Sequence, residues 1–237
     1  MQIGMSRRAP AALMDRRSKA KTVTRSDRRR DRTRAALLQA GRRLFALRDV
    51  DGVSVDEIVA AADVAKGSFY NHFADKDGFA REIGSAVRRQ AEFAVDQANA
   101  QITDPATSVA RALCVFIRFA VEHRDSAQVL WKLHSGATMI DAPINRGLRD
   151  LVQRGIDSRR FRHIDLESGV VLIMGIVVIS LRHALEERVA TPPLRIACTM
   201  AAGLLRALGI PPGQSARLAA AAAQAIIGND GREHSGL

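Results

Sequence analysis

The chain has 237 residues, of which 47% are hydrophobic but only 4% aromatic, and its formal net charge is +11. This length suits one medium domain or a small head on a larger body, and the composition favours packed helices. We expect no signal peptide, because no apolar core follows the first basic residues, and the longest uncharged apolar run, 168–181, is short for a membrane span. The sequence therefore predicts a cytoplasmic protein with no membrane partner.

The positive charge is concentrated at the N-terminus. Residues 1–34 carry twelve Lys or Arg and three Asp, which is nine of the eleven net charges. Residues 1–27 also lack apolar periodicity, so we interpret them as a flexible basic arm suited to a polyanion, with nucleic acid as the first candidate. Two alternatives stay open: a merely disordered tail, or a chain whose native start is Met5 or Met14.

Apolar periodicity begins after Asp31. Leu37, Ala40, Leu44 and Leu47 recur at helical spacing and predict a helix with one buried face. The next helix is predicted to start at Ser54, because Glu57 lies three residues later and completes a capping box.

A tight turn is predicted at Asp63, a residue that tolerates left-handed backbone. A second short helix follows from Lys66 to about Phe73, and Phe69 lies one turn before Phe73 and can pin it to the earlier helices. Two short helices joined by a tight turn and braced by a longer helix are typical of a helix-turn-helix.

The remainder predicts only helices. One runs from Asp75 to about Asn99, with Phe79, Ile83 and Phe93 on its inner face. No useful stretch alternates with a period of two, so the predicted fold is all-α: a three-helix head followed by a larger helical bundle. Further helices are predicted at 106–123, 126–134, 143–158, 166–188, 193–208 and 214–227. The expected organisation is a flexible basic arm at 1–27, a helix-turn-helix domain at 28–82, a larger helical domain at 83–228, and a flexible tail at 229–237.

The segment Ser54–Lys76, SVDEIVAAADVAKGSFYNHFADK, resembles the TetR family of transcriptional regulators. The sequence departs from the family pattern at Val59, Asp63 and Ala65, and the last departure removes the expected N-cap of the recognition helix. The positions in register are Ile58, Ala62, Val64, Gly67, Ser68, Phe69, Tyr70, His72, Phe73 and Lys76.

The candidate DNA-binding residues fall into two sets. In the motif, Ser68 and Asn71 are expected to read base edges, and Gly67 to let the backbone approach DNA. Lys66, Tyr70, His72 and Lys76 are expected at phosphates, a role that the resemblance implies for Tyr70 and Lys76; Ser54 either caps its helix or reaches a phosphate, and His72 can instead be a surface histidine without contact. Because residues 35–82 carry a net charge of −2, we hypothesise that basic residues before them contact the backbone or a minor groove: Arg28, Arg29, Arg30 and Arg32.

In the predicted body, the helix at 166–188 is apolar on all sides and the helix at 193–208 carries an apolar stripe. The resemblance implies a homodimer through this pair, whereas the residues alone also allow the pair to be the core of a monomer. The resemblance also implies a pocket for an unidentified small-molecule effector. Its candidate lining, which ordinary core packing explains equally, is Phe116, Ile117, Phe119, Trp131, His134, Met139 and Met174.

These observations favour a ligand-responsive repressor that binds double-stranded DNA at a palindromic operator. The alternative is a non-specific architectural DNA-binding protein driven by the basic arm. An enzyme is disfavoured, because we find no catalytic triad, phosphate loop or paired-carboxylate motif. The histidines and the two cysteines lack metal-ligand spacing, so no metal or cofactor is predicted.

Overall fold

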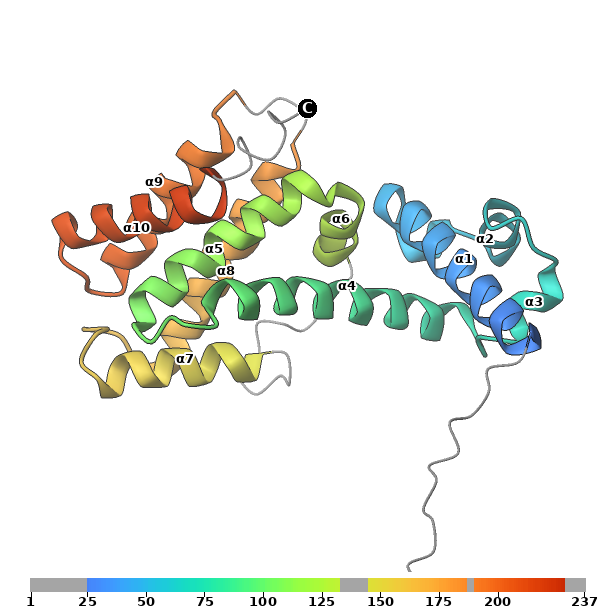
Figure 1. Ribbon diagram of the computed structural model, residues 1–237, viewed down its shortest axis with the longest axis horizontal. Coiled ribbons are helices and arrows are strands. Elements are labelled where there is room, and N and C mark those ends of the chain that lie inside the picture. Colours follow the sequence, from blue (N-terminus) through green and yellow to red (C-terminus); the bar gives the residue numbers. More distant parts are fainter. Residues whose placement is uncertain (1–24, 133–144, 187–189, 229–237) are drawn as a thin grey trace, which may run out of the picture.

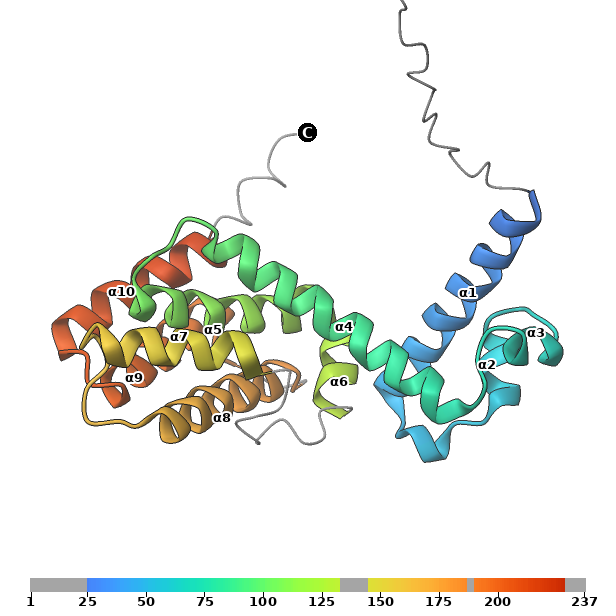
Figure 2. The same ribbon diagram turned by 90° about the horizontal axis from the view of Figure 1, so that it is seen from below.

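The computed structural model describes residues 25–132, 145–186 and 190–228, and within them every regular element is helical, as predicted (Figure 1). The head consists of α1 (Arg25–Leu47), a 3-10 turn η1 (Val50–Gly52), α2 (Val55–Ala61) and α3 (Lys66–Tyr70). The long helix α4 (Lys76–Asn99) joins the head to the body (Figure 2). The body contains α5 (Pro105–Glu122), α6 (Arg124–Lys132), α7 (Arg146–Asp157), α8 (Leu166–Ala184), α9 (Pro193–Ala207) and α10 (Pro212–Ile226).

Helix α1 begins earlier than the sequence pattern indicated. The arm was predicted to end at residue 27 and the apolar periodicity to begin after Asp31, but α1 starts at Arg25. Its first two turns are exposed on all sides, so they have no apolar face from which periodicity could detect them. Residues 1–24, the rest of the predicted arm, and 229–237, the predicted tail, lie outside the described residues.

The head packs around phenylalanine side chains. Phe45, Phe69, Phe73 and Phe79 are each at most 6% exposed, and the Phe69 and Phe79 rings meet edge to face with centroids 5.2 Å apart. Two apolar predictions were wrong here. Leu47, at the end of α1, is 75% exposed, and Phe93 on α4 is 64% exposed, whereas Val87 and Ala91 of the same helix are buried.

The head core continues into the near end of the body. Helix α6 lies against α1, and Ala127 and Val129 of α6 are fully buried in the same apolar cluster as Phe45. Leu185, at the end of α8, joins that cluster, and the Arg124 guanidinium at the start of α6 donates to its carbonyl oxygen. Helix α6 therefore connects α8 with the head.

Helix α5 is the centre of the body. It packs against α4, α8, α9 and α10, and its buried residues include Leu113 and Ile117. The Arg160 guanidinium, between α7 and α8, binds the Asp104 carboxylate at 2.6 Å and the Gln214 side chain at 3.1 Å, which ties this connection to the start of α5 and the first turn of α10. Burial alone would raise the pKa of Asp104, but Arg160 and Thr107 outweigh it and hold that pKa below its usual value.

The apolar composition of α8 predicts burial on more than one side, but the described residues bury only one face of it. Its inner face, with Ile173, Val177 and Leu181, is buried, whereas Val171 and Ile179 on its outer face are 47% and 59% exposed. By length and composition alone α8 could cross a membrane, although core helices of globular proteins pass the same test. One apolar face of this helix therefore has no partner among the described residues.

Candidate nucleic-acid interface

Helix α2 begins with the predicted capping box. The Ser54 hydroxyl accepts a hydrogen bond from the Glu57 backbone N–H at 3.2 Å, and the Glu57 carboxylate accepts one from the Ser54 backbone N–H at 2.8 Å. That backbone donor, followed by the Arg48 guanidinium at 2.7 Å, lowers the pKa of Glu57 to about 2. Of the two roles left open for Ser54, the structure shows the cap.

Helix α3 is short and lacks such a cap. Asp63 in the preceding turn has φ +53°, the left-handed conformation predicted for it. Ala65 is the N-cap residue of α3 and makes no side-chain hydrogen bond, as its departure from the family pattern implied. The five residues of α3 are held instead by Phe69, which is fully buried.

The outer face of α3 is open to solvent. Tyr70 is 56% exposed, Asn71 is exposed, and a Cβ atom added to Gly67 would meet nothing within 4 Å. Lys66 is also exposed, and its ammonium lies 2.8 Å from the Asp56 carboxylate, whose hydrogen bond raises the pKa of Lys66. An exposed pair of this kind is weak, so Lys66 can exchange Asp56 for a phosphate at little cost.

Lys76, expected at a phosphate, has other partners in the structure. Its ammonium donates to the carbonyl oxygens of Val50 at 2.9 Å and Val53 at 3.1 Å. These bonds use two of its three N–H donors and tie the start of α4 to η1. They give Lys76 a structural role beside the predicted contact with DNA.

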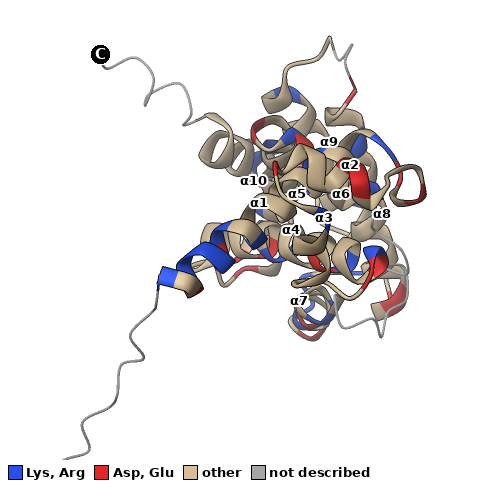
Figure 3. Ribbon diagram, turned by 90° about the vertical axis from the view of Figure 1, so that its right-hand side faces the viewer, with Lys and Arg blue, Asp and Glu red and all other residues tan. Residues whose placement is uncertain are grey.

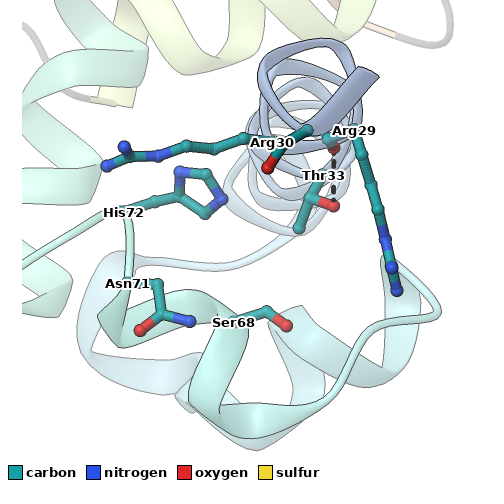
Figure 4. A pocket seen from close by; sticks show the side chains of 7 residues that line it. Arg29, Arg30, Thr33, Ser68, Asn71 and His72 are labelled. Atoms are coloured by element: carbon teal, nitrogen blue, oxygen red, sulfur yellow. Dashed lines mark hydrogen bonds between the residues drawn. The ribbon is translucent and has the colours of Figure 1, made fainter. Parts of the chain in front are cut away.

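A polar cleft of about 340 Å³ separates α1 from α3 (Figure 4). The sequence predicted Arg29, Arg30, Ser68, Asn71 and His72 as DNA-binding residues, and the structure brings all five together around this cleft. Figure 4 shows the Arg29 and Arg30 side chains diverging from α1 on either side, with the His72 ring beside Arg30.

The remaining lining residues, Ser26 and Thr33, were missed. With Arg29 and Arg30 they have the spacing i, i+3, i+4, i+7, which is one face of a helix. That spacing is visible in the sequence, but the four side chains are polar, and the search for helices relied on apolar residues. Ser26 also falls within the predicted flexible arm, residues 1–27. Arg28 and Arg32, the other predicted arginines, lie one turn apart on α1 and do not line the cleft.

The cleft lies beside a stretch of helix that is rich in arginine. Figure 3 shows the Lys and Arg residues gathered on the first turns of α1. Burial, followed by the nearby charges of Arg30 and Arg34, lowers the pKa of His72 below its usual value. The neutral form of the His72 ring is therefore favoured more than in an ordinary histidine.

The residues predicted to line an effector pocket differ in how deeply they are buried. Ile117 and Phe119 are buried core residues, and Phe116 and Met174 are partly buried against the body core. Trp131 is 38% exposed beneath the Arg182 guanidinium, 5.7 Å from its ring centroid. His134 and Met139 lie outside the described residues.

One buried polar residue of α8, Ser180, was not among the predicted site residues. Ser180 on α8 is 2% exposed, and its hydroxyl makes no hydrogen bond within the described part of the chain. A buried hydroxyl without a partner is uncommon and costs stability. The signal that could have found Ser180 is its position inside the apolar run 168–181.

Comparison with known sequences agrees with this geometry. The family described as bacterial regulatory proteins, tetR family, matches residues 37–83. The HTH-type transcriptional repressor DhaR of Mycobacterium sp. (strain GP1) is 44% identical over 50 residues, which is 21% of this chain and 25% of DhaR. The match thus spans a quarter of the length of that relative.

Solved structures extend the likeness over most of the chain. RolR in complex with its ligand resorcinol has a TM-score of 0.58 and 25% identity, covering 81% of this chain and 95% of RolR. AibR in complex with isovaleryl coenzyme A and operator DNA has a TM-score of 0.60 and 21% identity, covering 73% of this chain and 98% of AibR. The second likeness supports the fold alone.

Proposed function

We propose that the chain, whose residues 37–83 match the tetR family of bacterial regulatory proteins, is a transcriptional repressor that binds a palindromic operator and is released by a small molecule. The observation that carries the proposal is the solvent-facing side of α3, the proposed recognition helix. Gly67, Ser68, Tyr70 and Asn71 belong to α3 and its C-cap, and the buried Phe69 holds the helix against the head core. A helix presented in this way can enter the major groove. A protein with this role acts in the cytoplasm, on chromosomal DNA.

Dimerisation through α8, with α9 beside it, supplies the twofold symmetry that a palindrome needs. Val171, Gly175 and Ile179 follow one another at intervals of four on the outer face of α8, and Leu194 at the start of α9 is 37% exposed. An exposed apolar stripe on a body helix is typical of an interface. Because the solvent side of α9 also carries Arg195, Thr199 and Arg206, we assign the apolar part of the contact to α8.

The dimer is tested by Ile179→Glu, which places a charge in the proposed contact. We expect sedimentation equilibrium to show a folded monomer. Val121→Glu is the matched control, since Val121 is an exposed β-branched residue, 52% exposed, on α5 and not on α8, and it should leave the dimer intact. A dimer that persists in Ile179→Glu and dissociates in Val121→Glu would move the interface to α5.

We place the effector between α5, α6 and α8. The unpartnered Ser180 hydroxyl offers one hydrogen bond to a ligand, and Phe116 and Met174 offer apolar contact. RolR, which has the same fold, is solved with resorcinol, a ligand that suits such a combination. Since α6 contacts both α8 and α1, a ligand that favours one position of α6 shifts the separation of the two heads.

The experiment that tests the function is a selection from fragmented genomic duplex DNA at near-physiological salt, followed by sequencing. Enrichment of a twofold-symmetric site with half-sites one or more helical turns apart supports the proposal. Binding that follows only duplex length and salt would contradict it and favour the architectural alternative, for which the concentration of charge in residues 1–34 is the supporting observation.

A further inference from the structure

We infer that the cleft between α1 and α3 holds one backbone phosphate of the DNA, and that His72 takes up a proton from solvent when the phosphate enters. The inference rests on the proposed DNA binding and adds to it a second DNA-contacting element, α1, together with a dependence on pH. Half of the cleft comes from Ser26 to Thr33, which precede the segment that matches the family at residues 37–83.

The donors around the cleft suit a phosphate. Arg29 and Arg30 bring two guanidinium groups, whose planar N–H donors match phosphate oxygens. Ser26, Ser68 and Asn71 add neutral hydroxyl and amide donors. The lining includes no Asp or Glu and no large apolar side chain, so its chemistry selects an anion.

The position of the cleft identifies the source of that phosphate. Ser68 and Asn71 belong to the recognition helix and its C-cap, and His72 follows directly. When α3 lies in the major groove, the strand beside the groove passes between α3 and the start of α1. A phosphate of that strand is thus the anion nearest to the cleft.

His72 is the lining group whose charge can change near neutral pH. It is half-buried, and the charged side chains acting on it are Arg30, Arg34 and Asp31 of α1. Arg34 is itself paired with Glu82 of α4 and lies over the Phe73 ring, 5.3 Å from its centroid. Burial and the charges of Arg30 and Arg34 favour the neutral imidazole, and a phosphate in the cleft adds a negative charge beside the ring, so the protonated ring is more favoured in the complex.

The chain offers a matched pair of variants for the test. Arg29→Gln/Arg30→Gln removes the two cleft guanidiniums, and Arg28→Gln/Arg32→Gln removes two from the same turns of α1 that do not line the cleft. Both change the net charge equally, and Gln keeps the helix propensity of Arg. Affinity is measured for a random-sequence duplex over a range of salt concentrations.

We expect the cleft variant to lower the slope of log affinity against log salt by about 0.9 for each head bound, the value for one phosphate contact. The control variant should lose less than half of that. Equal losses in the two variants would overturn the inference, because the arginines would then act only as general positive charge.

The proton is followed by histidine NMR, with the His72 signals assigned from His72→Gln. We expect His72 to titrate at a higher pH in the duplex complex than in the free protein. Affinity should rise up to about tenfold from pH 8 to pH 6 if the pKa rises by one unit, and this rise should be absent in His72→Gln. An unchanged titration, or the same pH dependence in His72→Gln, would contradict the inference.

Two further comparisons separate a DNA phosphate from a free anion, and the cleft from the proposed repressor function. Inorganic phosphate at millimolar concentration tests for a free-anion site, and a His72 shift as large as that caused by duplex would overturn the assignment to DNA. Because the duplex is of random sequence, the result does not depend on an operator. A cleft-specific loss of salt dependence without any selected operator would support the cleft and contradict the proposed repressor.

Discussion

The head and the body bury their cores with different side chains. In the head, Phe45, Phe69, Phe73 and Phe79 meet in one aromatic cluster. The body core is built mainly from Ala, Val, Leu and Ile, with Phe161 as its one fully buried aromatic residue among those described. The elements differ as well, since α2 and α3 have seven and five residues and the main body helices have fifteen to nineteen.

This difference explains why the head can be recognised from its sequence and the body cannot. Helices of five or seven residues are not stable alone, so the head depends on particular aromatic contacts at particular positions. Longer helices that bury interchangeable aliphatic side chains tolerate many substitutions if volume is kept. The sequence match accordingly covers residues 37–83, whereas the likeness of the body is one of fold.

The largest expected effect breaks the aromatic cluster. Phe69→Ala removes a fully buried ring, and we expect the free energy of unfolding to fall by about 3–5 kcal/mol. Phe93→Ala is the matched control, because Phe93 is a helical phenylalanine that is 64% exposed, and it should change stability by less than about 0.5 kcal/mol. Urea unfolding of both variants measures the difference; comparable losses would show that the head does not depend on its aromatic core.

A smaller effect concerns the close contact of α1 with α4. A Cβ atom at Gly41 would lie 2.4 Å from the Phe79 ring and 2.7 Å from Ile83, so Gly41→Ala should lower stability by about 1–3 kcal/mol through overpacking. Gly67→Ala meets open space and should raise stability by about 0.5–1 kcal/mol, since alanine favours helix, while weakening DNA binding. Thermal unfolding and a binding assay check both; a stabilised Gly41→Ala would contradict the packing described.

The uncapped recognition helix gives the third prediction. Ala65→Ser supplies the side-chain acceptor that α3 lacks at its N-cap, and we expect a gain of about 0.5–1 kcal/mol. The measurement is hydrogen exchange at the first amides of α3, which should slow in the variant. Unchanged exchange and unchanged stability would show that Phe69 alone fixes this helix.

The smallest effect concerns the cap of α2. The pKa of Glu57 is about 2 in the fold against 4.5 for the ordinary group, so its contribution is present above pH 4.5 and is lost as the pH falls toward 2. In Glu57→Gln we expect a flatter decline of stability across this window. Because Glu57 is fully exposed, water screens the effect, and denaturant unfolding at several pH values is needed to see it. Identical profiles would remove Glu57 from the acid response.

The sequence predicted most of the architecture, because α5, α8, α9 and α10 are apolar segments that begin at Asp or Pro. It predicted the capping box and the left-handed Asp63, which depend on neighbouring residues only. The start of α1 and the cleft could not be predicted in this way, since they depend on an exposed polar helix and on contacts across the head. The carbonyl partners of Lys76 were missed for the same reason.

The most direct test of the account is a base-pair substitution scan of the selected operator with the wild type and with Asn71→Ala. If α3 reads the sequence, the variant should lose discrimination at one symmetric position in each half-site, by about 1–3 kcal/mol, and keep it elsewhere. Asn71→Ala with an unchanged base preference at every position would contradict the central claim that this face of α3 reads the DNA.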